Sequence, residues 1–155
     1  MSRATLARVA YIGAIESIWS VTGFLYVLHS HGWHWGDGSW MAPGNAHYLY
    51  WCEAVTMTQA TVVMCQVANG FACRTERESL FKVGLLSNKW LVYSQVVGIA
   101  LIAAISYLGP LQSIFKTGPL TLADWGLLVV AAITLFFAEE ARKWFARRRM
   151  APAGG

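Results

Sequence analysis

Four long apolar segments, separated by shorter polar stretches, constrain the fold of this chain more than any other feature of its sequence. They cover residues 6–28, 48–71, 90–108 and 120–138, of which 48–71 is the least apolar. Each approaches or exceeds the roughly 20 helical residues that cross the hydrocarbon core of a bilayer. Only 13% of the 155 residues are charged, and the mean hydropathy is +0.44. The pattern predicts an all-α membrane protein with four transmembrane helices in one bundle.

We expect one domain, a single transmembrane module over residues 1–150, followed by a disordered tail at 151–155. The basic start and long apolar run of the first segment fit a retained span better than a cleaved signal. The sequence "YLGPLQSIFKTGPLTLADW" is rich in glycine and proline, and it predicts a turn between the third and fourth segments.

The basic residues are distributed unevenly between the two sides of the predicted bundle. Four spans place both termini on one side, and loops on the cytoplasmic side are enriched in Lys and Arg. Of the twelve Lys and Arg, only Lys116 falls on the other side. We therefore expect a multi-pass protein of the plasma or inner membrane with both termini cytoplasmic. The +4 charge then serves orientation and contact with the lipid bilayer, and no nucleic acid is expected as a partner.

Polar side chains on the second segment fall on one arc when the chain is wrapped at 100° per residue. Thr58, Thr61, Cys65 and Asn69 share one stripe, and Gln59 and Gln66 share the adjacent one. The opposite side, which we expect to face lipid, carries Met57, Ala60, Val63, Met64, Val67 and Phe71. Polar residues in a span face the bundle, where they bond neighbouring helices or line an ion path. Both interpretations remain open for Gln66 and Asn69.

Glu16 places a carboxyl group near the middle of the first segment. An ionised carboxylate at that depth costs several kcal/mol unless it is paired, protonated or hydrated. Gly13, Ser20 and Gly23 share its helix face and permit close helix approach, so Glu16 is predicted to point into the bundle. It is a candidate ligand for a cation or a proton, and a hydrogen-bonded structural acid is the equal alternative.

His31, His34, Asp37 and His47 gather around the loop between the first two segments. Their spacing matches no sharp zinc motif. They are weak candidates for a metal site, and a free-standing four-helix protein that binds a metal or haem there is the alternative function.

The chain resembles the C-terminal membrane region, helices seven to ten, of P-type cation-transporting ATPases of the calcium or sodium-potassium pump type. "YIGAIESIWSVTGFLYVL" resembles the seventh helix and "TMTQATVVMCQVANGFACRTERESLF" the eighth with its inner loop. "NKWLVYSQVVGIALIAAISYLGPL" resembles the ninth and "LTLADWGLLVVAAITLFFAEEARKWFARR" the tenth. "CRTERESLF", "SNKWL" and "EEARK" are the most specific pieces.

The resemblance implies a module that scaffolds and partly lines the cation-binding region, with the rest of the ATPase, in cis or in trans, as its partner. The family's eighth helix contributes to the cation sites, which makes Gln66 and Asn69 candidate cation-site residues beside Glu16. The family's reaction needs an aspartate in a D-K-T-G motif and a nucleotide-binding domain, which these 155 residues lack. The chain alone is therefore not expected to hydrolyse ATP or to hold a cofactor, and ATP and Mg²⁺ would act only through the partner polypeptide.

Overall fold

The computed structural model describes residues 3–73 and 88–150, and in this part of the chain every regular element is helical. The elements are α1 (Arg3–Ser30), the short 3₁₀-helix η1 (Ser39–Met41), α2 (Tyr48–Ala72), α4 (Lys89–Tyr107), α5 (Gly109–Phe115) and α6 (Leu122–Met150). The all-α prediction is confirmed for these residues. The predicted tail at 151–155 and the basic residues Arg74, Arg77 and Lys82 lie outside them.

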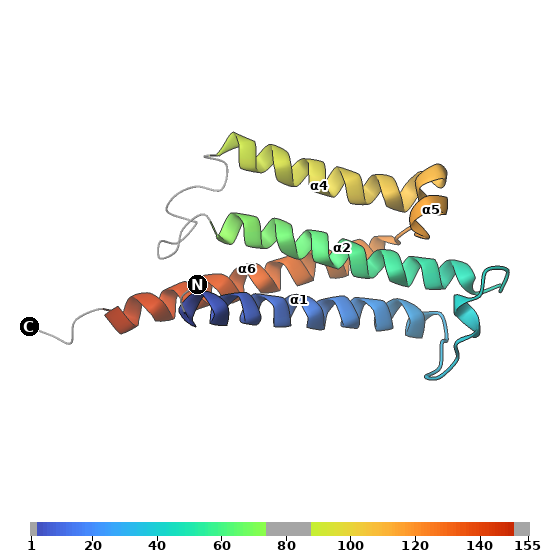
Figure 1. Cartoon of the computed structure of the whole chain (residues 1–155), viewed down its shortest axis with the longest axis horizontal. Coiled ribbons are helices and arrows are strands. Elements are labelled where there is room, and N and C mark those ends of the chain that lie inside the picture. The colour runs from blue at the N-terminus through green and yellow to red at the C-terminus, as the bar shows by residue number, and fades with distance from the viewer. Residues whose placement is uncertain (1–2, 74–87, 151–155) are drawn as a thin grey trace, which may run out of the picture.

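The four long helices lie alongside one another, and consecutive ones run in opposite directions (Figure 1). The start of α1 and the end of α6 lie at one end of the bundle, which we call the terminal end. The α1–α2 connection and α5 lie at the other, which we call the loop end. Helix α2 contacts α1, α4 and α6, and α4 lies on the side of α2 away from α1. The second helix is therefore the centre of the bundle.

Three of the four predicted spans are helices long and apolar enough to cross a membrane: Thr5–Ser30, Lys89–Tyr107 and Leu122–Ala146. Helix α2 is not among them, although its 25 residues reach about 37 Å. Its threonines and amides, together with Glu53, lower its hydropathy. Helix α2 contacts α1, α4 and α6, and ten of its side chains are buried.

Helix α6 begins two residues later and ends twelve residues later than the predicted span. At its start Thr121 and Asp124 cap each other. The Asp124 Oδ2 accepts from the Thr121 backbone N–H at 2.7 Å, and the Thr121 Oγ1 accepts from the Asp124 N–H at 3.3 Å. At its end the helix continues through "EEARKWFARRRM", because Ala, Glu, Arg and Lys favour helix once the apolar stretch stops.

The Gly/Pro-rich connection predicted as a turn contains the seven-residue helix α5. Pro110 lies in its first turn, where the missing N–H has no partner to lose. Lys116 ends it in the left-handed conformation at φ 54°. The glycine and proline residues therefore mark the ends of this connection correctly, but they do not predict the short helix α5 within it.

The expectation that Met57 and Ala60 face lipid is wrong. Both are buried, at 1% and 0% exposure, in the core that α2 forms with its neighbours. A Cβ on Gly23 of α1 would lie 3.1 Å from two atoms of the Met57 side chain, so this glycine allows α1 and α2 to approach closely. Because α2 has neighbouring helices on several sides, its apolar face packs against protein, and little of its surface is left uncovered.

Candidate functional site

Two of the three candidate cation-site residues meet across the contact between α1 and α2. The Gln66 Nε2 donates to both carboxylate oxygens of Glu16, at 3.1 and 3.3 Å. Glu16 is half-buried and Gln66 is exposed on the described chain. A carboxylate that accepts from an amide leaves the amide carbonyl oxygen available, so the pair places carboxylate and amide oxygen acceptors side by side.

The other polar side chains of the α2 arc do not bridge helices in the same way. The hydroxyls of Thr58 and Thr61 donate to the carbonyl oxygens of Ala54 and Met57, four residues earlier on the same helix. Such bonds satisfy the hydroxyl without a partner helix. Gln66 therefore differs from them, because its amide reaches a charged group on α1.

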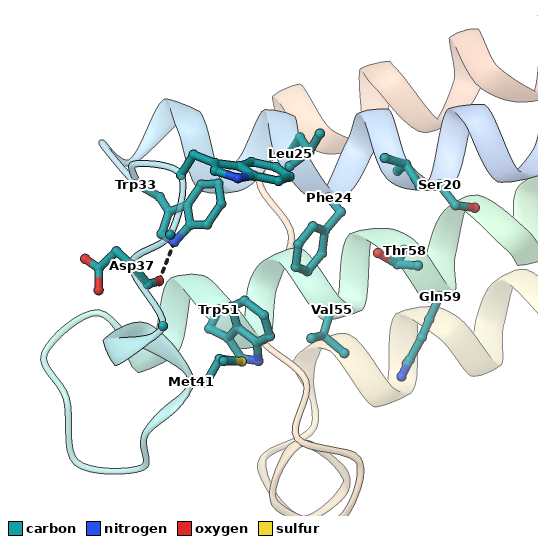
Figure 2. Close-up of a pocket in the computed structure, with 14 residues that line it drawn as sticks. Ser20, Phe24, Leu25, Trp33, Asp37, Met41, Trp51, Val55, Thr58 and Gln59 are labelled. Carbon is teal, nitrogen blue, oxygen red and sulfur yellow. Dashed lines mark hydrogen bonds between the residues drawn. The ribbon is translucent and has the colours of Figure 1, made fainter.

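A cavity of about 920 Å³ lies in the groove between α1 and α2, toward the loop end from the Glu16–Gln66 pair. Figure 2 shows its two ends, with Trp33, Met41 and Trp51 at one and Ser20, Thr58 and Gln59 at the other. Phe24 and Val55 lie between them on facing helices. The lining is mostly apolar, as in a groove that receives another apolar element.

Ser20 lies at the end of this cavity nearest Glu16, one helical turn along α1. Its side chain is 8% exposed, and within the part of the chain that the structure describes its Oγ has no hydrogen-bond partner. A buried hydroxyl without a partner costs free energy. Ser20 therefore carries a buried hydroxyl whose hydrogen-bonding capacity is not used by the described residues.

Asn69, the third candidate, belongs to a different contact at the terminal end. Its Oδ1 accepts from the Cys73 Sγ at 2.9 Å, and the same sulfur accepts from the Arg8 Nη2 at 3.2 Å. Spacing along α2 placed Asn69 beside Gln66. In the structure Asn69 is instead linked, through the Cys73 thiol, to Arg8 near the start of α1.

Arg8 also enters an ion-pair network at the terminal end. Its Nε lies 3.4 Å from the Glu139 Oε1, and the Arg142 Nε lies 2.8 Å from the Glu139 Oε2. The Glu139 side chain is fully buried. This network joins α1 to α6. The spacing of Glu139 and Arg142, three residues apart on one helix, indicates their pair from the sequence, whereas no local pattern indicates the contact with Arg8.

In the structure the four loop candidates for a metal site contact aromatic rings or nearby loop groups. His47 stacks on Trp40 with ring centroids 4.4 Å apart, and His34 lines a small cavity with Trp33 and Trp35. Asp37 accepts from the hydroxyl and the backbone N–H of Ser39, and these hydrogen bonds lower its pKa from the usual value.

His31, the remaining loop candidate, stacks on Tyr50 and lies near Glu53. Among the described residues no three His, Cys, Asp or Glu side chains are placed to hold one metal ion. The arrangement therefore does not support the metal or haem alternative.

Residues 1–145 match the family model described as "Cation transporting ATPase, C-terminus". The calcium-transporting ATPase 1 of Schizosaccharomyces pombe is 36% identical over 96 residues, which cover 61% of this chain and 10% of that protein. The calcium-transporting ATPase of Bacillus subtilis is 29% identical over 130 residues, which cover 83% of this chain and 13% of that protein. The chain thus spans about a tenth of the length of the curated relatives it matches.

Proposed function

Since this chain belongs to the family of cation-transporting ATPase C-termini, we propose that it is the C-terminal membrane module of a calcium-type pump and supports the cation-binding region. In this role its four long helices correspond to helices seven to ten of the pump. The remaining membrane helices and the ATP-hydrolysing domains belong to the rest of the ATPase, in cis or in trans. ATP and Mg²⁺ act there.

The proposal includes four spans with cytoplasmic termini. Helix α2 is too polar to qualify by hydropathy alone, but it lies antiparallel between α1 and α4 and contacts three apolar helices. A helix with neighbours on three sides crosses the bilayer with them, because most of its surface is in contact with protein and its remaining polar groups face the groove in which we place the pump's other helices. Arg8, Lys89 and Arg142 lie toward the terminal end and Lys116 toward the loop end, which supports cytoplasmic termini.

The groove between α1 and α2 is the surface on which we place the pump's other membrane helices. Its mostly apolar lining suits a membrane helix. The Glu16–Gln66 pair opens on the same α1–α2 contact, one turn from Ser20. A helix seated in the groove would therefore close over this pair.

The hydrogen bond from Gln66 to Glu16 is the observation that carries the functional proposal. Carboxylate and amide oxygens are ligands that Ca²⁺ prefers. Glu16 and Gln66 present these oxygens at the edge of the module, and they form one part of the wall of a cation site. The other ligands come from the partner helices.

The test is a double-mutant cycle in the complete pump. We expect Glu16→Gln and Gln66→Ala each to weaken the apparent Ca²⁺ affinity of ATP hydrolysis about tenfold, as for loss of one charge-assisted contact of about 1.4 kcal/mol. Because the two side chains contact each other, their effects should be non-additive. Thr134→Ala is the matched control, since this exposed α6 hydroxyl bonds only within its own helix in the described structure.

Two results would contradict different parts of the proposal. An unchanged Ca²⁺ dependence in both variants would remove Glu16 and Gln66 from the site wall. A chain that is neither continuous with a polypeptide that bears the phosphorylated aspartate nor co-purified with one would contradict the role as a pump module.

A further inference from the structure

Arg8, near the start of α1, contacts both helices that neighbour α1 at the terminal end. Its Nη2 donates to the Cys73 Sγ of α2 at 3.2 Å, and its Nε donates to the Glu139 Oε1 of α6 at 3.4 Å. Different nitrogens of one guanidinium group therefore serve different helices. Because the donors of this group are fixed in a planar fork, it binds two partners in a defined orientation.

Each partner of Arg8 is restrained by a second contact. The Cys73 Sγ donates to the Asn69 Oδ1 at 2.9 Å, which holds the thiol against α2. The Glu139 Oε2 accepts from the Arg142 Nε at 2.8 Å, and the Glu139 side chain is fully buried. Since both targets are held in place, binding to them restricts where the start of α1 can lie.

The Arg8–Cys73 contact and the Glu16–Gln66 contact lie along the same seam between α1 and α2. Glu16 follows Arg8 by eight residues on α1. Gln66 precedes Cys73 by seven residues on α2, which runs in the opposite direction. These spacings correspond to about 12 Å along α1 and about 10.5 Å along α2. The two intervals are nearly equal, so one alignment of the helices allows both contacts to form.

Close packing holds α1 against α2 on the other side of Glu16. Gly23 lies seven residues after Glu16, toward the loop end. A Cβ on Gly23 would lie 3.1 Å from two atoms of the Met57 side chain. Glu16 thus lies between two points at which α1 is held against α2. A hydrogen bond weakens steeply with changes in distance and angle, so the Glu16–Gln66 bond depends on this alignment.

We infer that Arg8 is a positioning residue for Glu16. It anchors the start of α1 to α2 and α6, and it thereby holds the Glu16 carboxylate within reach of the Gln66 amide. Asn69 belongs to the same anchor, because it accepts from Cys73. The effect on cation binding rests on the function proposed above, whereas the effect on the Glu16–Gln66 hydrogen bond does not.

The first experiment measures unfolding of the full chain in lipid nanodiscs. Cys73→Ala removes the acceptor of the Arg8 Nη2 at an exposed position, where the substitution leaves no cavity. We expect the unfolding constant to rise about fivefold, as for loss of one hydrogen bond. Cys73→Ser keeps a group that accepts from Arg8 and donates to Asn69, so it should unfold as the wild type does.

The deciding measurement is the coupling of Cys73→Ala to Gln66→Ala. Changes about 10 Å apart without a shared partner normally have additive effects on stability. If Arg8 positions Glu16, Gln66→Ala should raise the unfolding constant about fivefold in the wild type. In Cys73→Ala the same change should raise it less than about twofold, because the contact is already weakened.

Two further backgrounds complete this cycle. Arg8→Lys keeps a cation for Glu139 but replaces the fork with one ammonium group, so it should reduce the effect of Gln66→Ala in the same way. Thr134→Ala is the matched control, because its hydroxyl bonds only within α6 in the described structure. Gln66→Ala should keep its full effect in that background.

The second experiment uses the complete pump. Cys73→Ala should weaken the apparent Ca²⁺ affinity of ATP hydrolysis by up to about tenfold, the effect expected for Gln66→Ala, and leave the rate at saturating Ca²⁺ unchanged. Cys73→Ser should restore the affinity, and Cys73→Ala should add no further loss to Gln66→Ala. An unchanged Ca²⁺ dependence in Gln66→Ala would contradict the proposed cation site, and the unfolding cycle would then decide the positioning role by itself.

Additive effects of Cys73→Ala and Gln66→Ala on unfolding overturn the inference, because Arg8 would then stabilise the chain without acting on Glu16. A Gln66→Ala variant as stable as the wild type also overturns it, since no contact would be left to position. A loss of Ca²⁺ affinity in Cys73→Ala that persists in full in the Gln66→Ala background has the same consequence.

Discussion

Replacing Gly118 with alanine is expected to destabilise the folded chain by about 3 kcal/mol, the combined magnitude of an overpacked contact and a lost buried hydrogen bond. A Cβ at this position would lie 2.7 Å from the Glu53 backbone N and 3.1 Å from its Cα. These are backbone atoms of α2, which cannot rotate away. The connection before α6 would have to move out, and Thr56 would lose the Gly118 N–H.

Reversible unfolding in mixed micelles measures this effect. Gly126→Ala is the matched control, because a Cβ there meets no atom within 4 Å and the residue lies inside α6. Alanine in a helix interior should stabilise by about 0.5–1 kcal/mol relative to glycine. If Gly118→Ala unfolds with the same free energy as the wild type, the loop end is not packed as tightly as the structure places it.

The second large effect is expected at the terminal end, where Glu139→Ala should destabilise the chain by about 3 kcal/mol. The Glu139 carboxylate is fully buried and accepts from both Arg8 and Arg142. Its removal leaves two guanidinium groups in partly buried positions without their anion. Breaking one side of such a pair costs more than the pair itself contributes, because the remaining charge stays desolvated.

Unfolding of the same preparations in mixed micelles at neutral pH gives the size of this loss. Arg148→Ala is the control for Glu139→Ala on the same helix. Arg148 is exposed, and its Cζ lies 3.8 Å from the Trp144 ring centroid. That contact is worth about 0.5–1 kcal/mol at an exposed site. Equal losses of unfolding free energy in Glu139→Ala and Arg148→Ala would show that the Arg8–Glu139–Arg142 network contributes no more stability than a surface contact.

Helix positions were the part of the fold that sequence patterns predicted well. The predicted start of α2 at residue 48 agrees with the structure, and its end is one residue away. The observed range of α6 differs more from its predicted range. A hydropathy pattern ends where the apolar residues end, whereas the helix continues through charged residues that favour helix. Hydropathy thus locates the apolar part of a helix rather than its full length.

The candidate site was predictable in part. The cost of burying a carboxylate predicted that Glu16 points into the bundle, and in the structure it accepts from Gln66 of the neighbouring helix. The sequence around either residue does not indicate that the other is its partner, because the two are 50 positions apart. The same limit applies to Asn69, whose partner Cys73 lies one turn further along α2 while Arg8 comes from another helix.

The sequence by itself determined that this chain forms long helices and where each apolar stretch lies, since backbone groups in an apolar environment must be satisfied within the helix. It also determined that α2 carries a polar arc, because helical periodicity is a local property. Only the tertiary structure decided that α2 lies at the centre, that Met57 is buried, and that Gln66 reaches Glu16. Those outcomes depend on how the packed helices are rotated and aligned, and that choice is made by contacts between residues far apart in the chain.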